Sequence, residues 1–199
     1  MTREQIPNLL SSFRIVLIIP VIWALLIGYP LIALILFVIA GLTDSLDGWL
    51  ARREQCETSV GGVLDSVADK LLLVSVYICL WWLDSVPTWL IALLFGRDLL
   101  ISFGCLLYHT KLGQFKAAPT PTGKIHTFFQ ICLVILILAQ SSLFPDIPAD
   151  IIRGLMWILI ITAIVSLLGY TWQGYQDTRA AYYQKLHDAE KTDRATWHP

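Results

Sequence analysis

Long apolar stretches follow one another along the chain, separated by short polar gaps. The stretches are residues 9–27, 31–50, 61–83, 87–109, 124–143 and 150–173. Each is long enough for a helix that crosses the hydrocarbon core of a bilayer, which needs about 20 mostly apolar residues. The pattern therefore predicts an all-α integral membrane protein with six transmembrane helices.

The polar gaps fall into two classes that differ in charge. The gaps at 28–30, 84–87 and 145–148 contain prolines, which stop helices, and contain no Lys or Arg. The segments 1–14, 51–60, 110–124 and 174–199, on the other side, hold eleven of the 14 basic residues: Arg3, Arg14, Arg52, Arg53, Lys111, Lys116, Lys124, Arg179, Lys185, Lys191 and Arg194. Because basic residues favour the cytoplasmic side, both termini are expected in the cytoplasm, as an even number of spans requires.

Composition supports a lipid environment. Apolar residues make up 56% of the 199 residues, and 14 Lys and Arg residues nearly balance 15 Asp and Glu residues. A soluble domain of this length would need more polar surface, and no basic cluster suggests a nucleic-acid partner. Residues 1–176 are expected to form a membrane domain. Residues 177–199, which are charged and poor in large aliphatic side chains, are expected to form a polar cytoplasmic tail that is either a solvated extension of the last helix or disordered.

Four carboxylates interrupt the second and third apolar stretches. Asp44 and Asp47 stand at i and i+3, and Asp65 and Asp69 at i and i+4, so each pair shares one helix face. Counted along the predicted helices at about 1.5 Å per residue, all four aspartates lie near the ends of the two stretches that face the cytoplasm. An ionised carboxylate at the bilayer centre costs about 2.5–3.5 kcal/mol, so acids at membrane depth are expected to be functional.

The chemistry of the four carboxylates favours a metal site. Brought together, they would repel one another unless a cation neutralised them. Oxygen ligands without His or Cys favour Mg²⁺, Mn²⁺ or Ca²⁺. A carboxylate cluster that holds two ions is the arrangement that clamps phosphates during in-line displacement.

Small residues flank both carboxylate pairs. Gly48 and Ala51 follow the first pair, and glycines at 61–62 precede the second. Missing side chains let a bulky polar ligand approach the backbone. The Arg52 guanidinium could bind a phosphate through two N–H groups. A basic residue that marks the cytoplasmic end of a span explains Arg52 equally well.

Eight of these positions are spaced as in a known family. The spacing is Asp44-x2-Asp47-Gly48-x2-Ala51-Arg52-x8-Gly61-x3-Asp65-x3-Asp69. It resembles the complete signature of the CDP-alcohol phosphatidyltransferase family. Residues 6–14 are similar to the amphipathic N-terminal entry of that family, with Ser11 at a place that usually holds Thr. The resemblance covers residues 6–173, most of the membrane portion.

The resemblance implies a fold, a reaction and a location. It implies the CDP-alcohol phosphotransferase fold with six transmembrane helices, a homodimer, and a cytosol-facing cavity that holds two divalent ions, Mg²⁺ or Mn²⁺. It implies transfer of a phosphatidyl group from CDP-diacylglycerol to an alcohol or phospholipid acceptor, with release of CMP, in phospholipid biosynthesis. The expected location is the inner membrane of a bacterium, with the active site facing the cytoplasm.

The resemblance also implies a role for each signature residue. Asp44, Asp47, Asp65 and Asp69 would ligate the metals, Asp69 would also act as the general base on the acceptor hydroxyl, and Asp65 would share in catalysis. The implied contacts of the CDP group are Asp44, Gly48, Ala51, Arg52, Gly61 and Asp65.

A charged pair in the fourth apolar stretch bears on the acceptor. Arg97 and Asp98 lie about 15 Å from the start of that stretch, at membrane depth. They could neutralise one another or Lys70, or Arg97 could bind an anionic acceptor. The Gly-Arg-Asp triplet, together with residues 121–130, resembles the family branch that makes phosphatidylglycerol phosphate or cardiolipin, in which Lys124 would help hold a phosphate.

The resemblance leaves two acceptors open. Members that use glycerol 3-phosphate usually carry Arg-Glu at this place and a second Arg eight residues later, whereas this chain has Arg97-Asp98 and then Cys105. The triplet is more similar to that of the cardiolipin synthases, whose acceptor is phosphatidylglycerol. Inositol phosphate or aminoalcohol acceptors are less favoured alternatives.

Two other classes of protein could need intramembrane aspartates. A cation or proton transporter would show cation flux without a nucleotide requirement. A non-catalytic scaffold would tolerate loss of Asp65 or Asp69. His109 and His126, near the cytoplasmic interface, are expected to be snorkelling or capping groups rather than catalysts.

Overall fold

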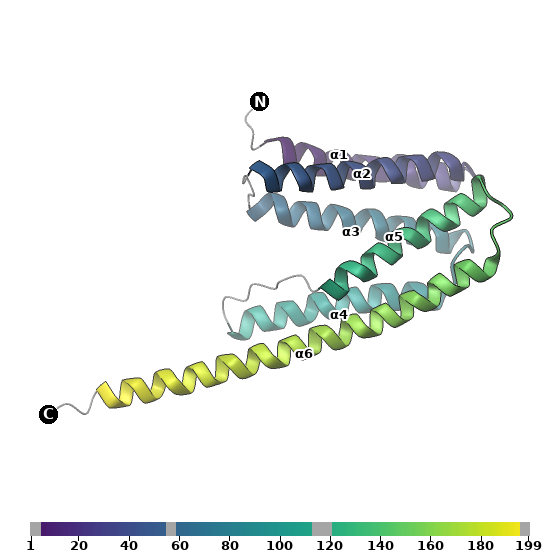
Figure 1. The fold of residues 1–199 in the computed structure, drawn as a ribbon. Helices are drawn as coiled ribbons and strands as arrows, with labels where there is room; N and C mark the ends of the chain where they lie inside the picture. The colour runs from purple at the N-terminus through teal and green to yellow at the C-terminus, as the bar shows by residue number, and fades with distance from the viewer. Residues whose placement is uncertain (1–4, 55–58, 113–120, 196–199) are drawn as a thin grey trace. The chain divides into compact units, whose positions relative to one another are not determined.

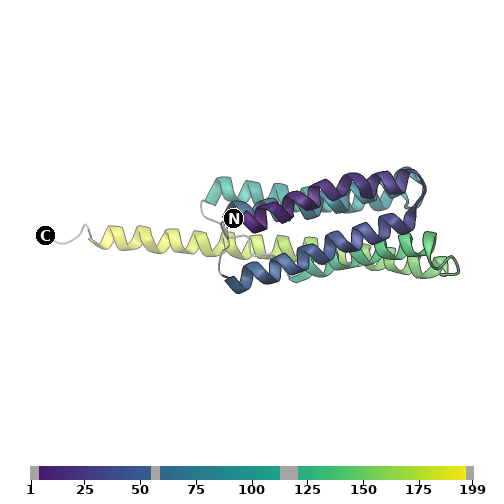
Figure 2. The ribbon, with the colours of Figure 1, turned by 90° about the horizontal axis from the view of Figure 1, so that it is seen from above.

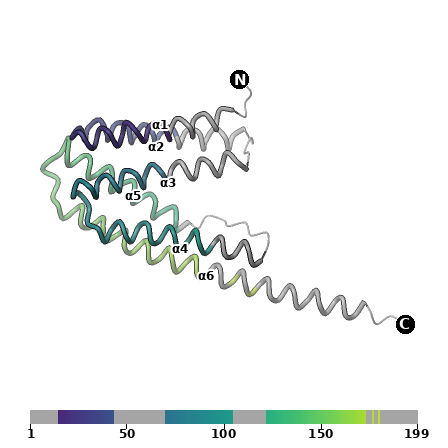
Figure 3. The backbone as a smooth tube through the Cα atoms, turned by 180° about the vertical axis from the view of Figure 1, so that it is seen from behind, coloured from purple at the N-terminus to yellow at the C-terminus, as the bar shows by residue number. Residues whose placement is uncertain are grey.

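A computed structural model gives the fold of the chain (Figure 1). It describes the backbone of residues 5–54, 59–112 and 121–195. Side chains are described for residues 15–43, 70–104 and 122–172 and for Gln176 and Arg179, which are coloured in Figure 3. Every regular element in these ranges is an α-helix, which confirms the all-α prediction for the described part of the chain.

The described residues form six helices. They are α1 (Gln5–Leu26), α2 (Pro30–Glu54), α3 (Ser59–Trp82), α4 (Thr88–Leu112), α5 (Pro121–Ser142) and α6 (Ala149–Ala195). Each contains most or all of one predicted apolar stretch. The largest difference is the end of α6, which continues through residues 174–195 without a break.

The turns after α1 and α3 have the same backbone geometry. After α1, Gly28 has a φ of 79°, and the amide of Tyr29 donates to the carbonyl of Ala24 at 2.8 Å. After α3, Asp84 has a φ of 54°, and the amide of Ser85 donates to the carbonyl of Leu80 at 2.9 Å. This is the Schellman arrangement, in which a left-handed residue ends the helix. Gly adopts it freely, and Asp is one of the few other residues that tolerate it.

The chain divides into two compact units. Unit 1 consists of Met1–Ala92 and Phe128–Ile158, and unit 2 of Leu93–Thr127 and Leu159–Pro199. In unit 1, α1 packs against both α2 and α3, and α1 and α2 run antiparallel (Figures 1 and 2). Buried side chains of these three helices include Val21, Ala24, Ala33, Phe37, Ala40, Val76 and Leu80. The alanines let helices approach closely, as is typical of helix packing in membranes.

Two helices among the described residues are long and apolar enough to cross a membrane. They are Thr122–Ser142 and Ala149–Trp172. Three shorter apolar helical segments, Ile15–Leu26, Pro30–Thr43 and Lys70–Trp82, each border residues whose side chains are not described. Large apolar side chains such as those of Trp23, Leu99 and Trp157 are mostly exposed, as lipid-facing helices require.

Replacing Tyr77 by Phe is expected to destabilise unit 1 slightly. The Tyr77 hydroxyl donates to the Gln130 carbonyl of α5 at 2.9 Å, and its ring is only 2% exposed. Interhelical hydrogen bonds in membrane proteins contribute about 0.6 kcal/mol on average. We therefore expect a small drop in the thermal unfolding midpoint of the detergent-solubilised protein. Tyr29→Phe, at an exposed ring, is the matched control, and equal midpoints for the two variants would contradict the prediction.

Candidate functional site

The four signature aspartates lie on two helices of unit 1. Asp44 and Asp47 belong to α2, and Asp65 and Asp69 belong to α3. The helical backbone puts each pair on one face of its helix, and both helices pack against α1. The side chains at positions 44–69 lie outside the described set, so the predicted meeting of the four carboxylates stays a prediction.

The predicted contacts of the CDP group also stay predictions. Gly48, Ala51 and Arg52 belong to α2 and Gly61 to α3, with side-chain surroundings outside the described set. Among the side chains that are described, no group of three or more His, Cys, Asp or Glu could hold a metal ion.

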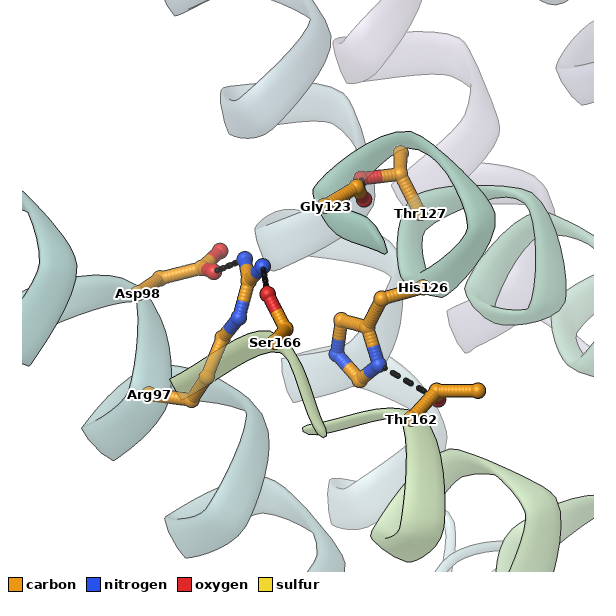
Figure 4. Close-up of polar contacts among 7 residues, drawn as sticks. All are labelled: Arg97, Asp98, Gly123, His126, Thr127, Thr162 and Ser166. Atoms are coloured by element: carbon orange, nitrogen blue, oxygen red, sulfur yellow. Dashed lines mark hydrogen bonds and ion pairs between the residues drawn. The ribbon is translucent and has the colours of Figure 1, made fainter. Parts of the chain in front are cut away.

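Arg97 forms a buried polar cluster in unit 2 (Figure 4). Its side chain is 7% exposed, and its Nη1 lies 2.6 Å from Oδ1 of Asp98. Its Nη2 donates to the hydroxyl oxygen of Ser166 on α6. Its Nε is buried and has no hydrogen-bond partner among the described residues. The guanidinium is thus neutralised and tied to α6, and Nε is its one nitrogen atom without a hydrogen-bond partner among the described residues.

The Arg97–Asp98 pair confirms one of the alternatives predicted for these residues. The two side chains neutralise one another, and Lys70, the other candidate partner, is exposed on α3. Breaking a buried ion pair by removing one partner costs about 3–5 kcal/mol, because it leaves an uncompensated buried charge. The pair is therefore important for unit 2, while an acceptor contact by Arg97 stays a prediction.

A second polar pair joins α5 to α6. His126 is fully buried, and its Nδ1 lies 2.9 Å from the hydroxyl oxygen of Thr162 (Figure 4). The Thr162 hydroxyl also lies within hydrogen-bond distance of the carbonyl oxygen of Leu159, at 3.1 Å. This contact links α5 to α6 through two side chains, and which of the two donates depends on the tautomer of the His126 ring.

The position of His126 corrects a prediction from the sequence. It was expected to snorkel or cap at the interface, but its side chain is buried. The periodicity of α5 contains the signal that would have found this, because His126, Gln130, Leu133 and Ile137 follow helical spacing and are all buried. His109 lies in α4, with its side chain outside the described set.

The sequence analysis also did not identify the face of α6 that contacts both Arg97 and His126. Thr162 and Ser166 stand four residues apart, so they lie on one face of the helix. Two hydroxyls at this spacing in an otherwise apolar stretch were the available signal. Lys124, the other predicted acceptor ligand, lies in the first turn of α5 and is exposed.

Comparison with known proteins identifies the family. The family model described as CDP-alcohol phosphatidyltransferase matches residues 4–168. The chain is 31% identical over 191 residues to a Bacillus subtilis protein named CDP-diacylglycerol–glycerol-3-phosphate 3-phosphatidyltransferase, with 92% of each chain covered. It is 33% identical to a protein of that name from Rickettsia felis, with 85% of this chain and 93% of the relative covered. It is 32% identical to a human cardiolipin synthase (CMP-forming), with 81% of this chain and 50% of the relative covered. The chain therefore belongs to the CDP-alcohol phosphatidyltransferase family, as its signature indicates, and is a transferase.

Proposed function

We propose that the protein transfers a phosphatidyl group from CDP-diacylglycerol to the hydroxyl of a glycerol-type acceptor. The observation that carries this proposal is the eight-position signature on α2 and α3, which lies inside the segment that the family model matches. The acceptor oxygen forms a new bond to the phosphorus that carries diacylglycerol. The bond from that phosphorus to the bridging oxygen of the CDP group breaks, and CMP leaves with the bridging oxygen.

The donor set of the signature fits divalent metal ions. Members of the family generally use such ions, and Asp44, Asp47, Asp65 and Asp69 offer only hard oxygen ligands, which suit Mg²⁺ or Mn²⁺. Two ions held by these residues would neutralise charge on the phosphates. Asp69 would accept the proton of the acceptor hydroxyl, with Asp65 sharing in catalysis. This role requires a carboxylate within hydrogen-bond reach of the hydroxyl.

The proposed CDP site consists of residues that offer space or polar groups. Gly48, Ala51 and Gly61 would leave room along the helices for the nucleotide. The Arg52 guanidinium would pair with a phosphate oxygen. Asp44 and Asp65 would complete the contacts of the CDP group.

We propose six spans with both termini in the cytoplasm of a bacterial cell. The family consists of membrane enzymes, and two helices of the described chain meet the length and apolarity of a span. Eleven of the 14 basic residues fall on one side of the proposed spans, which would orient the active site toward the cytoplasm. Residues 1–176 would form the membrane domain and residues 177–199 a polar tail, in a homodimer.

Phosphatidylglycerol is the acceptor that we favour. Arg97 is already neutralised by Asp98, and Cys105 stands where family members that use glycerol 3-phosphate usually carry a second Arg. A phosphate monoester carries a charge of about −1.5 to −2 at neutral pH, whereas a phosphodiester carries a single negative charge. A site with Arg97 but without a second Arg suits the single charge of the phosphodiester in phosphatidylglycerol. The product would be cardiolipin.

Glycerol 3-phosphate is the second candidate acceptor. The relatives from Bacillus subtilis and Rickettsia felis, whose names specify that acceptor, align with this chain over at least 92% of their own length. Arg97 and Lys124 would bind the phosphate of either acceptor. The buried Nε of Arg97 supports an anion contact, because an unpaired buried donor costs about 1–3 kcal/mol until an acceptor oxygen satisfies it.

Release of CMP by the purified, solubilised protein tests the function and selects the acceptor. CDP-diacylglycerol and Mg²⁺ or Mn²⁺ would be supplied with phosphatidylglycerol, glycerol 3-phosphate or inositol phosphate in parallel. We expect release that depends on phosphatidylglycerol. Release with glycerol 3-phosphate alone would select the second candidate. No release with any acceptor, from protein shown to be folded, would contradict the proposal.

Replacing Cys105 by Arg is expected to increase the use of glycerol 3-phosphate. A new guanidinium would restore the cation that the glycerophosphate-using members carry. A hydrogen bond to a charged group contributes about 1.5–3 kcal/mol, so turnover with glycerol 3-phosphate should rise about tenfold relative to turnover with phosphatidylglycerol. Cys105→Gln, which is polar but uncharged, is the control. An unchanged acceptor ratio in Cys105→Arg would show that this position does not select the acceptor.

A further inference from the structure

The hydroxyl of Ser166 differs from other hydroxyls on the helices. Thr43, Thr127, Ser141 and Ser142 each donate to the carbonyl four residues earlier in the same helix. This local bond is the usual way for a helix in an apolar medium to satisfy a hydroxyl. Ser166 instead accepts a bond from Arg97, 69 residues away in the sequence. Its hydroxyl therefore makes a tertiary contact.

The contacts of Arg97 show what that bond adds. Asp98, which neutralises the guanidinium, is the next residue on α4. It can supply charge, but it cannot fix the guanidinium relative to another helix. Among the described side chains, the bond to Ser166 is the one that ties Arg97 to α6. The orientation of the guanidinium relative to α6 therefore depends on Ser166.

Ser166 itself is firmly placed. It is fully buried, so water does not compete for its hydroxyl. One turn earlier on the same face, Thr162 binds His126 of α5 (Figure 4). Three residues later, a Cβ atom on Gly169 would lie 3.5 Å from the hydroxyl oxygen of Thr122. The contact between Thr162 and His126 thus ties α6 to α5 one turn before Ser166, and the backbone of α6 passes close to α5 at Gly169.

We propose that Ser166 is a positioning residue that orients the Arg97 guanidinium for the phosphate of the acceptor. The inference rests on the proposed function, in which Arg97 binds that phosphate. With Nη2 held by Ser166 and Nη1 by Asp98, the buried Nε keeps a fixed direction. A donor held in its binding orientation loses less conformational entropy when a ligand arrives, and this strengthens binding. Ser166 thus sets acceptor affinity without touching the acceptor.

Steady-state kinetics of Ser166→Ala test the proposal. We expect the KM for phosphatidylglycerol to rise about tenfold, since a hydrogen bond to a charged group contributes about 1.5–3 kcal/mol. The KM for CDP-diacylglycerol and the kcat at saturating acceptor should stay close to those of the wild type. A purely structural role would instead lower the thermal midpoint and kcat without this selective rise in KM. Ser142→Ala, which removes a hydroxyl that donates to the carbonyl of Leu138 in its own helix, is the matched control.

Arg97→Lys separates failure of this proposal from failure of the proposed function. If Arg97→Lys raises the KM for phosphatidylglycerol and Ser166→Ala does not, then Arg97 binds the acceptor without help from Ser166, and the positioning role is wrong. If neither variant changes that KM while CMP is still released, the function stands and the acceptor role of Arg97 is wrong. The same assays with glycerol 3-phosphate apply if that acceptor supports turnover.

Discussion

Asp69→Asn is expected to abolish CMP release and to leave the protein folded. The amide has the size of the carboxylate but cannot take a proton from the acceptor hydroxyl. General-base catalysis typically contributes about 100- to 10,000-fold to a rate, so turnover should drop by at least two orders of magnitude. The measurement is CMP release from CDP-diacylglycerol with saturating acceptor.

Asp146→Asn is the control for this substitution. Asp146 is exposed in the turn between α5 and α6, so the same chemical change there should leave turnover near the wild-type value. Equal thermal midpoints for the two variants would show that Asp69→Asn is folded. Turnover that persists in folded Asp69→Asn would remove Asp69 from the role of base.

The helices were predictable because apolar length and turn residues are local properties. Gly28 and Pro30 stand at a helix end and a helix start in the structure, as their backbone preferences require. The polar end of α6 confirms one of the two alternatives for the tail, a solvated extension of the last helix, up to Ala195. Residues 177–195 include four Ala, two Lys and two Arg, which favour helix whether or not lipid surrounds them. Hydropathy indicates which part of a helix lies in lipid, but it does not indicate where the helix ends.

The candidate site was predictable only where its partners are close in the sequence. Arg97 and Asp98 are neighbours, so a charge pair was one expected outcome, and the structure shows it. The bond from Arg97 to Ser166 and the burial of His126 depend on how α4, α5 and α6 are rotated against one another. Periodicity identifies the face of a helix that is buried, but not the helix that covers it. The sequence therefore indicated a role for Arg97 and Asp98, but neither the contact with Ser166 nor the burial of His126.

Removing divalent metal is expected to stop CMP release completely. The proposed ions would neutralise charge that builds up on the phosphates and so lower the activation barrier by several kcal/mol, which is on the order of a thousandfold in rate. Treatment with EDTA should abolish turnover, and added Mg²⁺ or Mn²⁺ should restore it. The ion that restores the higher rate would identify the preferred metal. Turnover that survives complete removal of metal would contradict the two-metal proposal.

Asp47→Ala is expected to have the same effect as EDTA even when metal is present. Four carboxylates share the proposed ions, and losing one removes both a ligand and a negative charge that holds the cations. Metal-dependent binding of CDP-diacylglycerol should therefore disappear together with turnover, and excess Mg²⁺ should not restore either. Asp146→Ala, at an exposed position, should keep both properties. If Asp47→Ala binds CDP-diacylglycerol as the wild type does, with the same dependence on metal, then Asp47 is not a metal ligand, and the donor set of the site must be assigned to other residues.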